Sequence, residues 1–231
     1  GWCRENERGV ERDVEKAVDW YVRAGGAGHA NGHHAAAVLL SKEDQSDAAR
    51  TRAFELFLNA ARKGHVMAAN SVGYRYEKGN GVETNLVEAI KWYRVAAEGG
   101  DAQAQYNMAI CNRFGTGVEA NSAVAVDWYA RAATNGYPKA AYHLSLYLRK
   151  ELKDAARGLE WMTFAAENDY LAAQYDLGNH YRYGRDGETI MVEAVKWYSM
   201  AAEGGHARAQ FSLALRYSNG EGVEKNEAVA L

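Results

Sequence analysis

The sequence predicts an all-α fold, a right-handed α-solenoid built from about six antiparallel helix pairs. Small and aromatic residues recur at i, i+3, i+4 and i+7, the spacing of one helix face. Glycines separate these stretches, and the 231 residues contain a single proline. A helix-pair repeat is typical of solenoids, because one pair cannot bury its apolar faces alone. Tryptophan marks the period of 36 residues, shortened once to 33, at Trp20, Trp92, Trp128, Trp161 and Trp197.

The second helix of each pair is predicted around the tryptophan. Ala89, Trp92, Tyr93 and Ala96 fall on one face, while charged residues fall on the opposite face. This is the pattern of an amphipathic helix with one buried stripe. We expect the indole to be buried between stacked units, so that replacing Trp128 by alanine costs about 3–5 kcal/mol.

The first helix of each pair has its own stripe of small residues. Ala68, Val72, Gly73 and Tyr76 share one face, just before a Gly-x-Gly-Val sequence at 79–82. Small residues on both stripes allow the two helix axes to approach closely, near the lower end of the ~8–10 Å range. Glycine adopts backbone angles that other residues resist, so the sequence at 79–82 predicts the loop between the two helices.

The repeats indicate one solenoid over residues 1–231. The second unit departs most from the pattern, because it lacks the glycine loop and has a polar stretch, Ser41–Asp47, that we expect to be a loop. The chain begins and ends inside a repeat, so we expect it to be a fragment without its flanking segments. The predicted units are approximately 1–28 (partial), 29–64 (degenerate), 65–100, 101–136, 137–169 (shortened), 170–205 and 206–231 (truncated).

These phrases resemble the Sel-one-like repeat (SLR) family, a relative of the tetratricopeptide repeats. The family pattern joins Ala-x-x-x-Leu-Gly-x-x-Tyr-x-x-Gly-x-Gly-Val to Lys-Ala-x-x-Trp-Tyr-x-x-Ala-Ala-x-x-Gly, and the second phrase is clear at Glu88–Tyr93 and Glu193–Tyr198. Tetratricopeptide repeats proper match less well, because their period is 34 residues. The resemblance implies a protein-interaction scaffold or adaptor in which the first helix of each pair lines the concave side of the superhelix.

Composition bounds the classes of partner and compartment. The net charge is −3, with 27 Lys and Arg against 30 Asp and Glu, so the basic surplus of a nucleic-acid binder is missing. No run of 18 apolar residues predicts a membrane span. Cys3 and Cys111 lie three units apart, roughly 30 Å if the helices of successive units stack at ~10 Å, and a disulfide needs Cα atoms within ~7 Å. Unpaired cysteines favour a reducing compartment such as the cytosol.

Catalytic and metal-binding patterns are weak. His29, His33 and His34 have helical spacing, but no cysteine or carboxylate accompanies them, and His29 shares its repeat position with His65 and His206. We therefore expect no metal site, no cofactor and no enzymatic activity. Two alternatives stay open: an enzyme on a helical scaffold, and a structural array that assembles end to end. The truncated ends also allow a dimer.

A candidate binding surface lies on the first helices, outside the core stripe. Side chains recur there at the repeat spacing in three rows, with tyrosines in the first row and arginines in the third. Tyrosine and arginine dominate interface hot spots, and arginine grips carboxylates, so we expect a peptide or protein partner with acidic and apolar side chains. Alternatively, the tyrosines pack between units and the arginines are solvated. The predicted binding residues are Asn70, Tyr74, Tyr106, Ile110, Arg113, Tyr142, Leu146, Arg149, Tyr175, Asn179 and Arg182.

Overall fold

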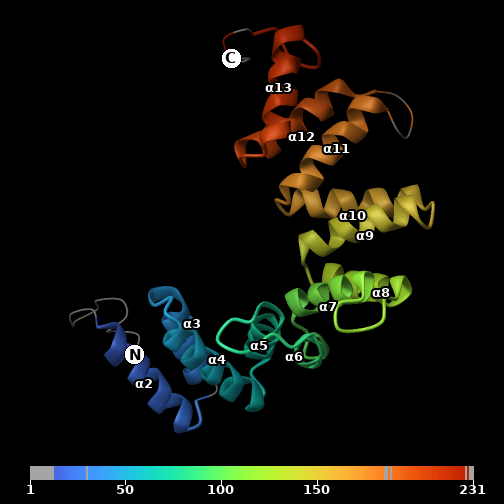
Figure 1. The fold of residues 1–231 in the computed structure, drawn as a ribbon. Helices are drawn as coiled ribbons and strands as arrows, with labels where there is room; N and C mark the ends of the chain where they lie inside the picture. The colour runs from blue at the N-terminus through green and yellow to red at the C-terminus, as the bar shows by residue number, and fades with distance from the viewer. Residues whose placement is uncertain (1–12, 30, 185–186, 188, 227, 229–231) are drawn as a thin grey trace. The chain divides into compact units, whose positions relative to one another are not determined.

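The computed structural model describes residues 13–29, 31–184, 187, 189–226 and 228, and all regular structure in these ranges is α-helix (Figure 1). The all-α prediction is confirmed. The helices are α2 (Val14–Gly26), α3 (Gly32–Glu43), α4 (Asp47–Arg62), α5 (Val66–Lys78), α6 (Leu86–Glu98), α7 (Ala102–Phe114), α8 (Ser122–Thr134), α9 (Pro138–Lys150), α10 (Ala155–Glu167), α11 (Leu171–Tyr183), α12 (Met191–Glu203) and α13 (Ala207–Asn219).

The chain forms two compact units, Gly1–Asn135 and Gly136–Leu231. The first contains α2 to α8 and the second contains α9 to α13. Within each unit, every helix packs against its neighbours along the chain, as a repeat of helix pairs requires. We call the first helix of each pair helix A (α3, α5, α7, α9, α11 and α13) and the second helix B (α2, α4, α6, α8, α10 and α12).

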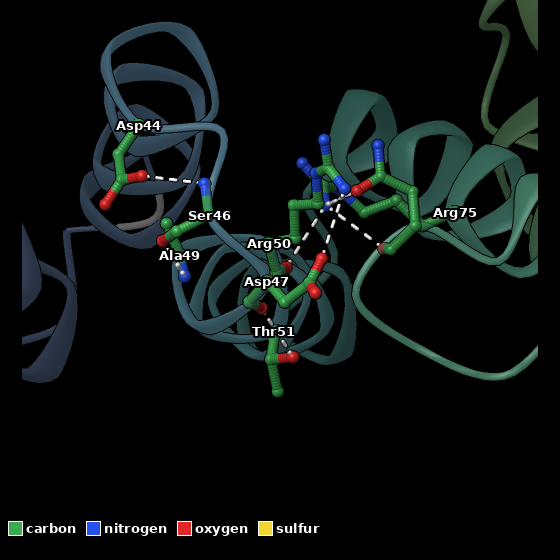
Figure 2. Close-up of polar contacts among 8 residues, drawn as sticks. Asp44, Ser46, Asp47, Ala49, Arg50, Thr51 and Arg75 are labelled. Atoms are coloured by element: carbon green, nitrogen blue, oxygen red, sulfur yellow. Dashed lines mark hydrogen bonds and ion pairs between the residues drawn. The ribbon is translucent and has the colours of Figure 1, made fainter.

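The loop expected at Ser41–Asp47 is shorter than predicted, because only residues 44–46 lie outside the helices. Helix α3 extends through Glu43, and α4 begins at the last residue of the stretch. In the short connection, Oδ1 of Asp44 accepts a hydrogen bond from the Ser46 amide at 2.7 Å (Figure 2). Oγ of Ser46 in turn accepts from the Ala49 amide at 3.2 Å. The polar residues at this point cap the start of α4. Because capping residues are polar, the sequence pattern indicated a loop.

The tyrosine after the tryptophan fills the core more completely than the tryptophan does. Tyr93 and Tyr129 are fully buried, whereas Trp92 and Trp128 are only partly buried against the core. The expectation that the indole is buried was therefore wrong at Trp92 and Trp128, and at Trp20, which is 51% exposed. Trp197 is buried, so the expectation holds at that repeat.

Small residues on helix A make room for these tyrosine rings. At Gly73 in α5, an added Cβ would lie 2.6 Å from Cδ1 of Tyr93. Gly178 in α11 has the same relation to Tyr198, at 2.7 Å. Both distances are far below normal van der Waals contact. The close approach of the two helices predicted from their small residues is confirmed in these two pairs.

The Gly-x-Gly-Val sequences form the predicted loops and pack against the preceding repeat. Gly81 has a φ of +76°, and a Cβ there would lie 2.1 Å from the carbonyl oxygen of Arg50 in α4. Gly117 has a φ of +71° and meets the carbonyl oxygen of Leu86 in α6 in the same way, at 2.5 Å. Glycine is therefore needed at these positions both for its backbone angle and for its lack of a side chain.

Candidate functional site

A groove of about 460 Å³ lies over the helix-A faces of the first unit. Helices α3, α5 and α7 supply most of its lining, with one residue from α4 and one from the loop after α5. We call it the helix-A groove. It is lined by Val38, Ser41, Lys42, Phe57, Asn70, Ser71, Tyr74, Arg75, Asn80, Gln103 and Asn107.

The groove exposes two large apolar side chains at matching positions of adjacent repeats. Tyr74 in α5 is 50% exposed and Val38 in α3 is 46% exposed. The two residues are one period of 36 apart, so each helix A presents the same turn of its surface to the groove. Exposed apolar side chains that line a hollow are a feature of surfaces that a partner covers.

Amide side chains join the adjacent helices at the other edge of the groove. Nδ2 of Asn107 in α7 donates a hydrogen bond of 3.1 Å to Oδ1 of Asn70 in α5. A carboxamide has two donor hydrogens and an accepting oxygen, so this bond leaves each side chain with further hydrogen-bonding capacity. Gln103, one turn earlier on α7, is exposed in the same wall. This edge can meet the peptide groups of a chain lying in the groove.

A buried arginine lies at the floor of the groove. Nη1 of Arg75 donates hydrogen bonds of 3.2 Å to the carbonyl oxygen of Arg50 and to both oxygens of Asn80 (Figure 2). Nη2 donates to Oγ of Ser41 at 2.5 Å. The guanidinium also lies over the ring of Phe57, 5.0 Å from its centroid. Burial lowers the pKa of Arg75, but an arginine side chain stays protonated in proteins.

In the first unit, the predicted binding residues have different environments. Asn70 and Tyr74 line the groove. Tyr106 is only 8% exposed, and its ring lies 5.8 Å from that of Tyr129. Ile110 is half-buried. Arg113 is exposed and lies 5.1 Å over the ring of Phe114.

In the second unit, the first-row tyrosines contact the next helix A. Tyr142 in α9 donates a hydrogen bond of 2.8 Å from its hydroxyl to Oδ2 of Asp176 in α11. Burial, with the negative charge of Asp176 as the next cause, raises the pKa of Tyr142. Tyr175 in α11 stacks on His206, the N-cap residue of α13, with ring centroids 4.8 Å apart. These tyrosines therefore join successive repeats, which favours the packing alternative stated for them above.

Arg149, Asn179 and Arg182 interact with the helix-B residue that follows the tryptophan, which is Met162 or Tyr198. Nη1 of Arg149 lies 3.6 Å from Sδ of Met162. Tyr198 donates a hydrogen bond of 2.8 Å to Oδ1 of Asn179. Burial raises the pKa of Tyr198, and the positive charge of Arg182 acts in the opposite direction. Leu146 is half-buried.

The groove also includes residues that the sequence analysis missed. Arg75 and Phe57 were assigned to no binding row, Asn80 was placed in the glycine loop at 79–82, and Lys42 was placed in the polar stretch Ser41–Asp47. One signal was present in the sequence. Arg75 recurs as Arg216 at the same repeat position, where the other repeats of this chain have different residues. A charged residue on the buried side of a helix is a marker of a polar interaction in the interior.

Histidine and cysteine side chains were also considered as metal ligands. His33 is buried, and its pKa is lowered by burial and by the charge of Lys63. No group of three or more His, Cys, Asp or Glu side chains in the described ranges is placed to hold a metal ion. Cys111 is buried, which raises the pKa of its thiol to about 11. Cys3 lies outside the described residues.

The comparison with protein families identifies the repeat. The model of the Sel1 repeat matches residues 1–29, 45–65, 66–101, 102–137, 138–170, 171–206 and 207–231. The chain belongs to the Sel1 repeat family. The resemblance stated from the sequence is thereby confirmed. Sel1 repeat proteins generally mediate protein–protein interactions, and the Sel1 repeat is a scaffold fold rather than a catalytic one.

Solved structures of Sel1 repeat proteins are similar to this chain. A Sel1 repeat protein from Oxalobacter formigenes is 27% identical, with a TM-score of 0.69 and 93% of each chain covered. The protective antigen c5321 of uropathogenic Escherichia coli is 24% identical, with a TM-score of 0.63; the match covers 99% of this chain and 65% of that one. The immunity protein Pa5087 of Pseudomonas aeruginosa is 22% identical, with a TM-score of 0.56 and coverages of 88% and 78%. The last two similarities concern the fold alone.

No curated protein matches the chain. Among the helices that the structure describes, none combines the length and the apolar character needed to span a bilayer.

Proposed function

We propose that this Sel1 repeat chain is an interaction scaffold that binds a segment of a partner protein in the helix-A groove. One observation carries the proposal: Val38 and Tyr74 are exposed at the same position of adjacent repeats and line one hollow. Tyrosine contributes a large contact area at low entropic cost, and it is enriched among residues that dominate binding energy.

The dimensions of the groove favour a short extended segment. Three helix-A elements line it, and successive helices in such a stack lie ~10 Å apart. The groove therefore extends about 20 Å, which an extended chain of roughly six residues spans. Asn70, Gln103 and Asn107 lie along one wall and offer donors and acceptors to the main chain of that segment.

A random library of displayed 12-residue peptides tests the proposal. Peptides selected on the chain are labelled, and their affinities are measured by fluorescence polarisation. We expect Tyr74→Ala and Val38→Asp to weaken binding at least ~10-fold, the effect of losing one hot-spot contact. Val95→Asp is the matched control, because Val95 in α6 is equally exposed but lies outside the groove. Equal loss in all three variants, or none in the groove variants, would place the binding surface elsewhere.

A further inference from the structure

Two buried arginines occupy the same position in repeats of the two units, and their charges are met differently. Arg75 in α5 is 6% exposed and Arg216 in α13 is 4% exposed. Each arginine contacts the loop residue that lies five positions later in the sequence. In the second unit this residue is Glu221, whose Oε2 lies 2.9 Å from Nη1 of Arg216. In the first unit it is Asn80, which offers oxygen atoms but no negative charge.

The groups around Arg75 accept hydrogen bonds from its guanidinium but leave its charge unbalanced. Its acceptors are the hydroxyl of Ser41, the carbonyl of Arg50 and the oxygens of Asn80. Among the residues that the structure describes, no carboxylate forms an ion pair with Arg75, and Asp47 pairs with Arg50 instead, at 3.2 Å. A buried cation without an anion is costly, so the placement of Arg75 favours binding of a negative group.

The guanidinium can be reached from the groove. Arg75, Ser41 and Asn80 line the same hollow as Lys42, which is exposed at its rim, and the groove lining contains no Asp or Glu. Nη2 carries two hydrogens and donates one to Ser41, so a second one can bind an incoming oxygen. The groove therefore offers positive charge from Arg75 and Lys42 and an apolar wall at Tyr74. A segment with a negative and an apolar side chain fits these surroundings.

We infer that the helix-A groove holds an acidic segment of its protein partner, with one Asp or Glu carboxylate paired to Arg75 and Lys42 and a neighbouring apolar side chain on Tyr74. The inference rests on the proposed function, because it names the chemistry of the segment that the groove binds. The partner carboxylate supplies to Arg75 what Glu221 supplies to Arg216 within its own repeat.

Asn80→Asp tests the inference with a minimal change in shape. The new carboxylate keeps the acceptor for Nη1 of Arg75 and adds the charge that Glu221 provides in the other unit. Two displayed 12-residue libraries are the probes: one has Asp or Glu at a central position, the other Asn or Gln, and both are otherwise random. Circular dichroism and thermal unfolding establish that each variant is folded.

We expect the unchanged chain to enrich the acidic library at least ~10-fold over the amide library, and Asn80→Asp to abolish that preference. Lys42→Gln, an exposed change, lowers the preference without a risk to folding. Glu221→Gln, in the other unit, is the control and leaves the preference unchanged.

The outcomes separate this inference from the proposed function. If both libraries enrich equally and the selected peptides still depend on Tyr74, the scaffold function stands and the role of Arg75 is overturned. If neither library yields peptides that depend on Tyr74, both proposals are overturned. An acidic preference that survives in both Asn80→Asp and Lys42→Gln also overturns the inference, because the carboxylate then binds elsewhere.

Discussion

Tyr93 of α6 donates a hydrogen bond of 2.7 Å from its hydroxyl to Oε2 of Glu77 in α5. Burial raises the pKa of Tyr93, and the bond to Glu77 raises it further. The ring is fully buried while the carboxylate lies near the surface, so the bond fixes the two helices of a pair at the margin of their interface. In the next pair, Arg113 stands at the position of Glu77. Burial raises the pKa of Tyr129, and the positive charge of Arg113 acts in the opposite direction.

Tyr93→Phe should destabilise the first unit. The substitution keeps the buried ring but removes a hydrogen bond to a charged group, and such bonds contribute about 1.5–3 kcal/mol. Because Glu77 is partly solvated, we expect a loss of about 1–2 kcal/mol in the free energy of unfolding, measured by urea denaturation. Glu77→Gln keeps an acceptor and should cost less. If Tyr93→Phe costs no more than Glu77→Gln, the bond contributes little.

Alanine at Tyr129 should cost more stability than alanine at Trp128. Tyr129 is fully buried, so its removal leaves a cavity and we expect a loss of about 3–5 kcal/mol. Trp128 is only partly buried, and Arg131 covers its ring at 4.8 Å, so about 1–2 kcal/mol is expected. Urea denaturation ranks the two variants.

The loss should stay local, because each repeat contacts only its neighbours. Hydrogen exchange of Tyr129→Ala should therefore increase in α7 and α8 and the helices packed on them. A larger loss at Trp128, or uniform exchange across the described helices, would contradict this account.

The period, the helices and the glycine loops were predictable because they depend on local sequence. Ala89 and Ala96 mark a buried stripe, and Gly81 marks a loop, wherever the repeat occurs. The sequence did not show which of Trp92 and Tyr93 is the buried ring. The two residues are adjacent and lie ~100° apart around the helix, so both fall within the width of the apolar stripe. Gly73 on the facing helix leaves the room that the Tyr93 ring fills.

The groove was predicted in part. Asn70 and Tyr74 were found because they stand outside the core pattern, and both line the groove. Arg75 was missed because it falls between these rows and the core, and its importance depends on Asn80, five residues away in a loop. Which side chains meet across such a loop depends on backbone geometry that the repeat spacing does not contain.

Gly158→Ala should destabilise the second unit, although alanine favours helix by up to ~1 kcal/mol. Gly158 in α10 stands where other repeats have alanine, and a Cβ there would lie 2.3 Å from Cγ of Arg149 in α9. We expect a net loss of about 1–3 kcal/mol, as for other overpacked sites. Gly26→Ala in α2 is the control and should be neutral or slightly stabilising, because the described structure leaves open space there.

Arg149→Ala should relieve this clash. In a double-mutant cycle, the combined variant is expected to lose less stability than the sum of the two single variants, because the stem of Arg149 is the group displaced. Additive losses, measured by urea denaturation, would mean that the backbone near Gly158 resists the new methyl group.

The first unit should lose stability in mild acid through His34. This ring stacks on His65 with centroids 4.3 Å apart and meets the edge of Phe57 at 5.6 Å. Burial, followed by the charge of His65, lowers the pKa of His34 to about 4, from an ordinary value of 6.5. The unfolded chain therefore takes up a proton as the pH falls below about 6.5, while the folded chain resists until about 4. The stabilisation is complete above pH 6.5 and is lost as the pH falls toward 4.

His34→Phe should remove this part of the pH dependence, because phenylalanine keeps an aromatic ring on His65 and cannot titrate. After a discount for solvent screening of the half-buried ring, the difference between the free energies of unfolding at pH 7.5 and pH 4.5 should shrink by roughly 2 kcal/mol. A remainder is expected from His33, whose pKa is also lowered. Tyr175→Phe alters the equivalent stack on His206 in the second unit but keeps His34, so it should keep the original pH dependence. An unchanged difference in His34→Phe would mean that His34 is solvated enough to accept its proton in the folded chain.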